Sequence, residues 1–280
     1  MFPLDFYSMK KLIYDSEFFD IKDTLECGQI FRFKPFKDGY LIFSLGNACY
    51  AYKSGDKTVV ETDDEEYFYK FFDLGEDYSR IFGYAMQCDF DVVKKSASAG
   101  KGIRILRQDP EEMLYSFIIS QNNNIPRIKG IIEKTCSALG DRKEFMGEEY
   151  YAFPSSEKLA EKDEKFYSEL GYGYRAGYMT AVSKAMTEGF KIDDSLPTAM
   201  LKAKLLTLKG VGPKVADCIS LFGYHRTDSF PVDTWIEKLY VEDFGGTEKD
   251  RKKITEYFQN LFGEYSGYVQ QYVFFYKRGN

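Results

Sequence analysis

The sequence predicts an α+β fold in which an N-terminal antiparallel sheet precedes a mainly α-helical region. Two observations carry this prediction. Apolar and polar residues alternate between turn signals up to about residue 60, and the spacing of apolar residues becomes helical from about residue 63. We therefore expect an N-terminal α+β lobe over residues 1–98 and a helical region over residues 99–280. A chain of 280 residues is long enough to bury a substantial core.

The strand signals are concentrated in the segment FRFKPFKDGYLIFSLGNACYAYKSGDKTVVE, which covers residues 31–61. Turn residues occur at 37–39, 46–47 and 54–56, and thus recur every eight or nine residues. Short strands at such regular spacing indicate an antiparallel meander.

Helix start and stop signals organise the rest of the chain. Asp109 is expected to cap a helix, with Pro110 in its first turn and Glu112 at the capping-box position. Gly140 and Gly189 are expected to end two further helices, and residues 247–250 to open one near the C-terminus.

The most informative stretch is LKGVGPKVADCISLFGYHRTDSFPVDTW, residues 208–235. Helices are expected at about 198–207 and 213–223, joined by a hairpin in which Gly210 and Gly212 permit a tight turn and expose N–H groups to an anion. The second helix adds partial positive charge at its N-terminus, so that the hairpin can hold a phosphate without a basic side chain. Lys214 supplies a nucleophile, and Asp233 in the Pro-Val-Asp loop supplies a fixed negative charge.

Further motifs accompany this stretch. They are GQIFR at 28–32, GIRILRQDP at 102–110, SFIISQNNNIPRI at 116–128, LGYGYRAGY at 170–178 and an aromatic C-terminal helix around Gln270 and Phe274. Together with the hairpin and its aspartate, they resemble the 8-oxoguanine DNA glycosylases of the helix-hairpin-helix superfamily that cleave DNA with a lysine. The resemblance runs from residue 27 to the end and places the helix-hairpin-helix at about 198–224.

The resemblance implies a chemical role for each of the two residues of the hairpin and loop. Lys214 would attack C1′ of the damaged nucleotide and form a Schiff base, and Asp233 would stabilise the positive charge that builds up on the sugar. We expect the helix N-terminus and partial burial to disfavour the ammonium form of Lys214. Alternatively, Lys214 is a surface lysine on a DNA-contacting turn. Asp233 is also expected to cap the helix that follows, which is compatible with catalysis.

The resemblance also implies a pocket for the extruded base. Cys218 and Phe274 would contact its two faces, and Gln270 would read its Watson–Crick edge. The carbonyl of Gly28 would accept a hydrogen bond from N7–H of 8-oxoguanine and repel the N7 lone pair of guanine. The base must be flipped out of the duplex because its glycosidic bond is otherwise out of reach. The alternatives are core packing for Cys218 and Phe274 and a strand-end glycine at position 28.

On the opposite strand, the resemblance assigns Asn122, Arg127 and Arg175 to the cytosine left unpaired. Tyr174 would fill the gap that the flipped base leaves. The alternatives are a plain loop at Asn122 and phosphate contacts for the arginines. Trp235 departs from the pattern, since eukaryotic members have a histidine two residues after the loop aspartate. The role of that histidine cannot be carried over.

Composition limits the partners and cofactors. The net charge of −6 argues against a nonspecific nucleic-acid coating protein and predicts modest nonspecific affinity. Five scattered cysteines and one histidine favour neither a metal centre nor an iron–sulfur cluster, so we expect no cofactor. The absence of a long apolar run or secretory signal predicts an intracellular protein without membrane contact. It would be cytoplasmic or nucleoid-associated in a prokaryote and nuclear in a eukaryote, and is expected to act as a monomer.

The leading functional prediction is therefore a glycosylase and lyase that excises 8-oxoguanine opposite cytosine from double-stranded DNA. Two alternatives stay open. One is a superfamily glycosylase for another damaged base, although Lys214 is atypical of the alkylation branch and scattered cysteines are atypical of the iron–sulfur branches. The other is a noncatalytic DNA-binding protein that uses the hairpin for phosphates.

Overall fold

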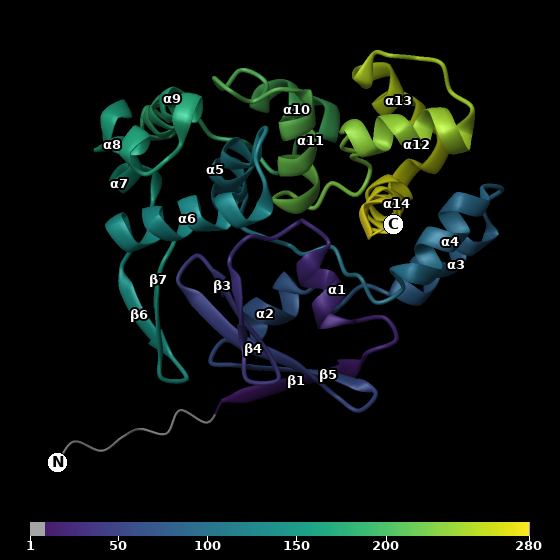
Figure 1. Cartoon of the computed structure of the whole chain (residues 1–280), viewed down its shortest axis with the longest axis horizontal. Coiled ribbons are helices and arrows are strands. Elements are labelled where there is room, and N and C mark those ends of the chain that lie inside the picture. The colour runs from purple at the N-terminus through teal and green to yellow at the C-terminus, as the bar shows by residue number, and fades with distance from the viewer. Residues whose placement is uncertain (1–8, 280) are drawn as a thin grey trace.

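The N-terminal lobe contains a five-stranded antiparallel sheet, as the sequence predicts (Figure 1). The computed structural model describes residues 9–279. Four strands follow one another as a meander, and the first strand pairs with the last at the far edge, which gives the order β1-β5-β4-β3-β2. The strands are β1 (Lys10–Asp15), β2 (Phe33–Phe36), β3 (Gly39–Ser44), β4 (Asn47–Ser54) and β5 (Lys57–Thr62).

The three predicted turns each separate two consecutive strands of the meander. The expectation of strands throughout this region is wrong for helix α1 (Ile21–Glu26). Its cause is a local cap, since the Asp20 carboxylate accepts a hydrogen bond from the Asp23 N–H at 3.1 Å. The part of the prediction that falls on residues 1–8 lies outside the described residues.

Helices dominate the rest of the described chain, and the predicted α+β class is correct. They are α2 (Glu65–Phe71), α3 (Tyr78–Gln87), α4 (Asp91–Ala99), α5 (Pro110–Ser120), α6 (Ile125–Leu139), α7 (Ser156–Ala160), α8 (Glu164–Glu169), α9 (Ala176–Thr187), α10 (Thr198–Leu205), α11 (Pro213–Phe222), α12 (Thr234–Phe244), α13 (Arg251–Phe262) and α14 (Ser266–Gly279). Short 3₁₀ turns precede two of them, at Gly173–Arg175 and Gly263–Tyr265. A small hairpin of β6 (Arg142–Phe145) and β7 (Glu148–Tyr151), for which the sequence suggested nothing, lies between α6 and α7.

The helix boundaries follow the predicted signals with one exception. Asp109 caps α5 and accepts hydrogen bonds from the N–H groups of Glu111 and Glu112 at 2.9 Å each. The capping-box role of Glu112 is wrong. Its buried carboxylate instead accepts the Leu45 N–H at 2.7 Å and lies 3.5 Å from the Arg32 guanidinium. A side chain expected to act within its own helix therefore ties α5 to the sheet.

The other predicted boundaries are close to the observed ones. Gly140 is the C-cap of α6, and Gly189 follows α9 with a φ of 101°. Asp250, the last residue of the predicted opening segment 247–250, caps α13 with its side chain.

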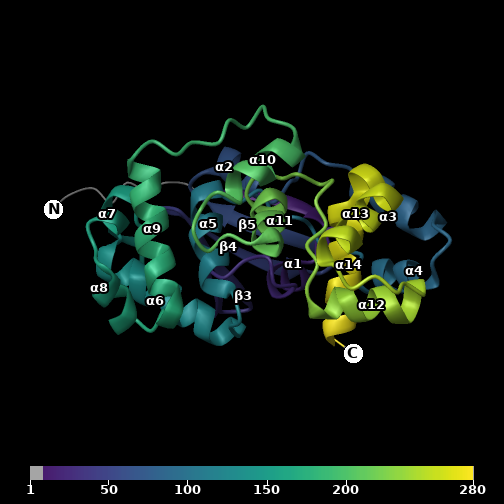
Figure 2. The same ribbon diagram turned by 90° about the horizontal axis from the view of Figure 1, so that it is seen from above.

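One hydrophobic core connects the two predicted regions. It includes Cys27 and Phe31 beside the sheet, α3 and α4, and residues of α14 near the C-terminus. Helix α14 packs against α4, α12 and α13, and Figure 2 shows these helices gathered at one end of the molecule. Both views place α10 and α11 between that group and the group formed by α6 to α9. The division between residues 98 and 99 falls at the end of α4 and stays a prediction.

No helix within residues 9–279 combines the length and the apolar character that crossing a membrane would require.

Candidate active site

The hairpin between α10 and α11 lies where the sequence predicts it. Gly210 has a φ of 86°, and a Cβ at this position would lie 2.4 Å from the ring of Tyr178, so only glycine fits. Gln121 at the end of α5 donates to the Gly210 carbonyl at 2.9 Å and holds the hairpin in place. Gly212 begins α11 as its N-cap, and a Cβ there would meet nothing within 4 Å. The hairpin is thus rigid at Gly210 and open to a ligand at Gly212.

Two cavities meet beside this hairpin. An outer cleft of about 570 Å³ is lined by residues from the segments 120–123, 212–217, 232–234 and 250–255. An inner cavity of about 40 Å³ is lined by Cys27, Gly28, Phe117, Lys214, Cys218, Phe222, Pro231, Asp233, Gln270, Gln271 and Phe274. Lys214 and Asp233 line both spaces. All six residues predicted for catalysis and base binding therefore converge, although they come from opposite ends of the chain.

The Lys214 amine is held among groups that favour its charged form. Burial by itself would lower its pKa, but the Cys218 side chain and the carboxylates of Asp233 and Asp217 outweigh burial and raise the pKa above its ordinary value. Burial disfavours the ammonium form, as expected from the sequence, but its neighbours outweigh it, so the pKa of Lys214 is raised in the free protein. Lys214 must lose a proton before it can act as a nucleophile.

Asp233 is the N-cap of α12, as predicted. Its Oδ1 accepts hydrogen bonds from the N–H groups of Trp235 and Ile236, both at 3.0 Å. Both bonds end on the same oxygen, so that no described residue donates to Oδ2. One carboxylate can therefore hold the helix with one oxygen and present the other to a ligand.

The walls of the inner cavity contain polar groups that lack partners. Gln270 donates through Nε2 to the Pro231 carbonyl at 3.3 Å, whereas its buried Oε1 receives no hydrogen bond from the described residues. Cys218 is buried one helical turn beyond Lys214, and burial raises the pKa of its thiol although the Lys214 ammonium acts in the opposite direction. A buried acceptor without a donor is costly, which points to a ligand that supplies one.

Gly28 forms the opposite wall with a φ of 93°, a conformation that favours glycine. Its carbonyl accepts no hydrogen bond from the residues that the structure describes. The Phe274 ring lies against it, since a Cβ on Gly28 would be 3.3 Å from Phe274 Cε1. A cavity of about 40 Å³ has room for roughly three water molecules and is too small for a bicyclic purine. Side chains that line the cavity, among them Phe274, would therefore have to move before a base of that size could enter.

Of the residues predicted to contact the opposite strand, Asn122 lines the outer cleft, and Tyr174 and Arg175 contact the 121–122 loop beside it. Tyr174 is 53% exposed, and its hydroxyl accepts a hydrogen bond from Asn122 Nδ2 at 3.3 Å. Arg127 is exposed and donates to the Gly171 carbonyl at 3.1 Å. Arg175 is buried and donates to the carbonyls of Tyr172, at 3.1 Å, and of the 121–122 loop. In the free protein Arg175 supports this loop, while Arg127 is accessible.

Two features of the site were not anticipated from the sequence. Asp217 is buried in the wall of the outer cleft, three residues after Lys214, and its Oδ1 lies 2.5 Å from the Lys202 ammonium of α10. The spacing of three from Lys214 could have suggested a shared helix face. Trp235 is 42% exposed beside Asp233, with Lys238 Nζ 5.3 Å from its ring centroid.

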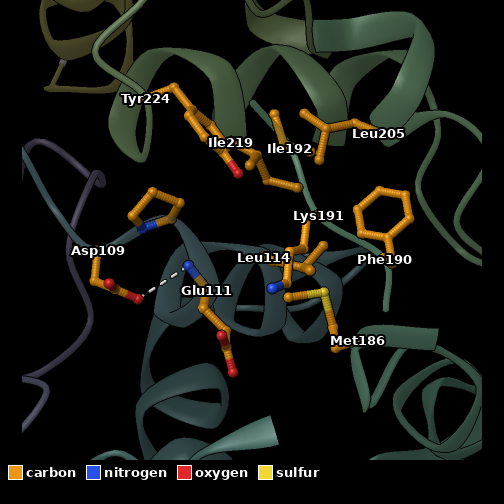
Figure 3. Close-up of a pocket in the computed structure, with 11 residues that line it drawn as sticks. Asp109, Glu111, Leu114, Met186, Phe190, Lys191, Ile192, Leu205, Ile219 and Tyr224 are labelled. Atoms are coloured by element: carbon orange, nitrogen blue, oxygen red, sulfur yellow. Dashed lines mark hydrogen bonds between the residues drawn. The ribbon is translucent and has the colours of Figure 1, made fainter. Parts of the chain in front are cut away.

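A separate cavity of about 310 Å³ lies between α5, α9, α10 and α11. Figure 3 shows its mixed lining, which combines Asp109 and Glu111 at the start of α5 with apolar side chains such as Ile219 and Leu205. None of the predicted catalytic or base-binding residues lines it. Within residues 9–279, no group of three or more histidine, cysteine, aspartate or glutamate side chains is placed to hold a metal ion.

Two family models together match most of the chain. The model described as 8-oxoguanine DNA glycosylase, N-terminal domain, matches residues 11–114. The model described as HhH-GPD superfamily base excision DNA repair protein matches residues 115–264, which include the hairpin and Asp233.

Comparison with individual curated proteins also finds N-glycosylase/DNA lyases. The N-glycosylase/DNA lyase OGG1 of Arabidopsis thaliana is 37% identical over 191 residues, which are 62% of this chain and 52% of that protein. The N-glycosylase/DNA lyase of Saccharomyces cerevisiae is 36% identical over 51% of this chain and 42% of its own length. The match thus spans about half the length of these curated relatives.

A solved structure matches over nearly the full length of both chains. It is the Clostridium acetobutylicum 8-oxoguanine glycosylase/lyase in complex with double-stranded DNA containing cytosine opposite 8-oxoguanine. It is 37% identical, has a TM-score of 0.89, and the match covers 97% of this chain and 98% of that chain.

The two hairpin glycines should respond differently to the same substitution. Gly210→Ala places a side chain at positive φ against Tyr178, so we expect it to lower the free energy of unfolding by about 2–5 kcal/mol. Gly212→Ala has free space and ordinary backbone angles and should cost less than about 1 kcal/mol. Urea unfolding of both variants checks this, and equal losses would contradict the role given to Tyr178. Adding Tyr178→Ala should restore part of the stability lost in Gly210→Ala.

Proposed function

Because this chain belongs to the 8-oxoguanine DNA glycosylases of the HhH-GPD superfamily of base excision DNA repair proteins, we propose that it excises 8-oxoguanine from duplex DNA and then cleaves the strand at the abasic site. The observation that carries this proposal is the position of Lys214 and Asp233 where the outer cleft meets the inner cavity. Such a position brings an amine and a carboxylate to the sugar of an extruded nucleotide whose base lies in the inner cavity.

The two side chains divide the chemistry between them. As the glycosidic bond breaks, its electron pair leaves with the base and positive charge develops on the sugar next to Asp233. The deprotonated amine of Lys214 attacks C1′, and opening of the sugar ring gives a Schiff base. Loss of a proton from C2′ then expels the 3′ phosphate and breaks the strand. The proton that Lys214 carries in the free protein must leave before the attack.

The inner cavity is suited to the lesion. The Watson–Crick edge of 8-oxoguanine carries N–H donors, which match the unpartnered Oε1 of Gln270. The lesion also carries an N7–H donor, whereas guanine has a lone pair there, and the unpartnered carbonyl of Gly28 can distinguish the two. Cys218 and Phe274 would contact the two faces of the base after Phe274 has moved away from Gly28.

Tyr174 and Arg127 are exposed and are suited to the strand opposite the lesion. Tyr174 would enter the gap left by the flipped base, and Arg127 would donate to the acceptors of the unpaired cytosine. Asn122 and Arg175 would complete this contact, Arg175 after releasing part of its carbonyl contacts. Phosphates would bind at the open N–H groups around Gly212. Such a substrate requires the protein to act in the compartment that holds the genome.

Loss of the nucleophile tests the proposal most directly. Lys214→Gln should abolish borohydride trapping of a covalent complex and strand scission on duplex containing 8-oxoguanine opposite cytosine, while binding of that duplex survives. Trapping at the wild-type level would exclude Lys214 as the nucleophile. If neither the wild-type protein nor Lys214→Gln were trapped, the proposed lyase activity would be contradicted and the alternative of a noncatalytic DNA-binding protein would be favoured.

The raised pKa of Lys214 predicts a pH dependence. Below that pKa the neutral fraction of the amine grows roughly tenfold per pH unit. The single-turnover rate of trapping on an abasic duplex should therefore rise with pH from about 6 to 9, as long as proton loss precedes attack. A flat profile over this range would show that the amine is already neutral in the complex.

Excision should depend on the opposite base. Adenine has no carbonyl in place of cytosine O2 and puts a larger ring with different groups in the same space, and a lost hydrogen bond to a charged donor is worth about 1.5–3 kcal/mol. Single-turnover excision opposite cytosine should exceed that opposite adenine by about 10-fold or more. Arg127→Ala should remove most of this preference, whereas Lys134→Ala, an exposed cation on the same helix, should not. Equal wild-type rates would mean that these arginines do not read the base.

A further inference from the structure

Arg278 lies beside Gly28, the residue whose carbonyl would recognise the lesion. Arg278 lies near the end of α14, four residues after Phe274 and on the same helix face. Its guanidinium carbon is 5.8 Å from the Phe274 ring centroid. Its NH2 group donates to the Glu26 carbonyl at 2.9 Å, which ties the end of α14 to the end of α1. This contact brings the guanidinium to Gly28, two residues beyond Glu26.

The approach to Gly28 is close. A Cβ built on Gly28 would lie 2.9 Å from Arg278 NH1, nearer than the 3.3 Å to Phe274 Cε1. None of the described residues accepts a hydrogen bond from NH1. The charge also reaches the cavity wall, because Arg278 lowers the pKa of the Cys27 thiol, although burial dominates and raises that pKa to about 12. An exposed charged donor without a protein acceptor therefore adjoins Gly28 at the edge of the inner cavity.

The chemistry of the lesion matches this pair of groups. 8-Oxoguanine differs from guanine at two adjacent atoms, since it carries N7–H in place of a lone pair and a carbonyl oxygen, O8, in place of C8–H. The Gly28 carbonyl can accept from N7–H but can do nothing for O8. Arginine has five donors and no acceptor, and its hydrogen bonds are charge-assisted. An arginine beside Gly28 is therefore suited to bind O8, which lies next to the N7–H group that the Gly28 carbonyl would bind.

We propose that Arg278 donates a hydrogen bond to O8 of 8-oxoguanine and is a second specificity-determining residue beside Gly28. This inference rests on the proposed function, because it concerns the same base pocket. Once Phe274 has moved away from Gly28 to admit the base, the guanidinium beside Gly28 would be within reach of the purine edge that carries N7 and O8. The bond from NH2 to Glu26 can persist and hold the planar guanidinium in place. Guanine would leave the same donor without an acceptor.

Removing the guanidinium separates base reading from the other steps. A hydrogen bond to a charged group is worth about 1.5–3 kcal/mol, so Arg278→Leu should slow single-turnover excision of 8-oxoguanine by about 10- to 100-fold. The same variant should trap a preformed abasic duplex at the wild-type rate, because that substrate has no base to read. Equal slowing on both substrates would assign Arg278 to DNA binding or folding and overturn the proposal.

An altered base tests the contact at the level of one atom. 8-Thioguanine retains N7–H but replaces O8 with sulfur, which is a weaker acceptor. The wild-type protein should excise 8-oxoguanine faster than 8-thioguanine, and Arg278→Leu should lose most of that difference. An unchanged ratio in the variant would show that Arg278 does not contact O8, even if its excision rates fall.

Two further variants complete the test. Lys277→Met removes the same charge from the neighbouring residue, whose ammonium lies 2.6 Å from Asp243, and should leave the ratio of the two bases at its wild-type value. Arg278→Lys keeps a donor and should recover part of the ratio. If Lys277→Met changed the ratio of the two bases as much as Arg278→Leu does, the change would be due to net charge and the proposed contact with O8 would be overturned. Absence of trapping by the wild-type protein would instead be a failure of the proposed function.

Discussion

The amine of Lys214, held among a thiol and two carboxylates, is the feature on which the rest of the site depends. Burial alone would lower the pKa of Lys214, and Cys218, Asp217 and Asp233 together outweigh burial and raise that pKa. The raised pKa requires α11 to place Asp217 and Cys218 near Lys214, and it requires the 231–234 loop to bring Asp233 close to the same amine. The α10–α11 hairpin meets these requirements because Gly210 packs directly under Tyr178 and because Gln121 binds the hairpin carbonyl. The contacts that position the Lys214 amine thus also favour its charged form.

The inner cavity is small, and its wall contains acceptors to which no described protein group donates. Gln270 Oε1 and the Gly28 carbonyl are the clearest examples, and both face a space too small for a purine. Leaving acceptors unpaired costs stability, and a base with donors at matching positions would recover that cost. The Phe274 ring lies against Gly28. In the proposed function, the favoured base is the one whose hydrogen bonds to these acceptors offset the free-energy cost of enlarging the cavity.

The acidic composition is compatible with the proposed DNA substrate, because backbone N–H groups and single exposed side chains can bind DNA without a positive net charge. The open backbone at Gly212 lines the outer cleft, Tyr174 is exposed beside the 121–122 loop, and Arg127 is accessible. Arg175, by contrast, is buried and donates hydrogen bonds to the carbonyls of the 121–122 loop, which hold this loop in place. The buried contact of Glu112 with Arg32 and Leu45 serves a similar purpose, since it fixes α5, and with it Gln121, relative to the sheet.

The sequence by itself determined the features that arise within a few residues. Alternation and turn residues predicted the meander, Gly210 and Gly212 the hairpin, and Asp109 and Asp233 the helix caps, because each depends on hydrogen bonds or backbone angles close by in the chain. Only the tertiary structure decided which distant groups meet. Glu112 left its expected cap for Arg32 on the sheet, Arg175 became buried, and Lys214 acquired a raised pKa from neighbours that α11 and the Asp233 loop supply. Arg278 reached Gly28 because α14 packs back against the N-terminal lobe, and no local pattern records that contact.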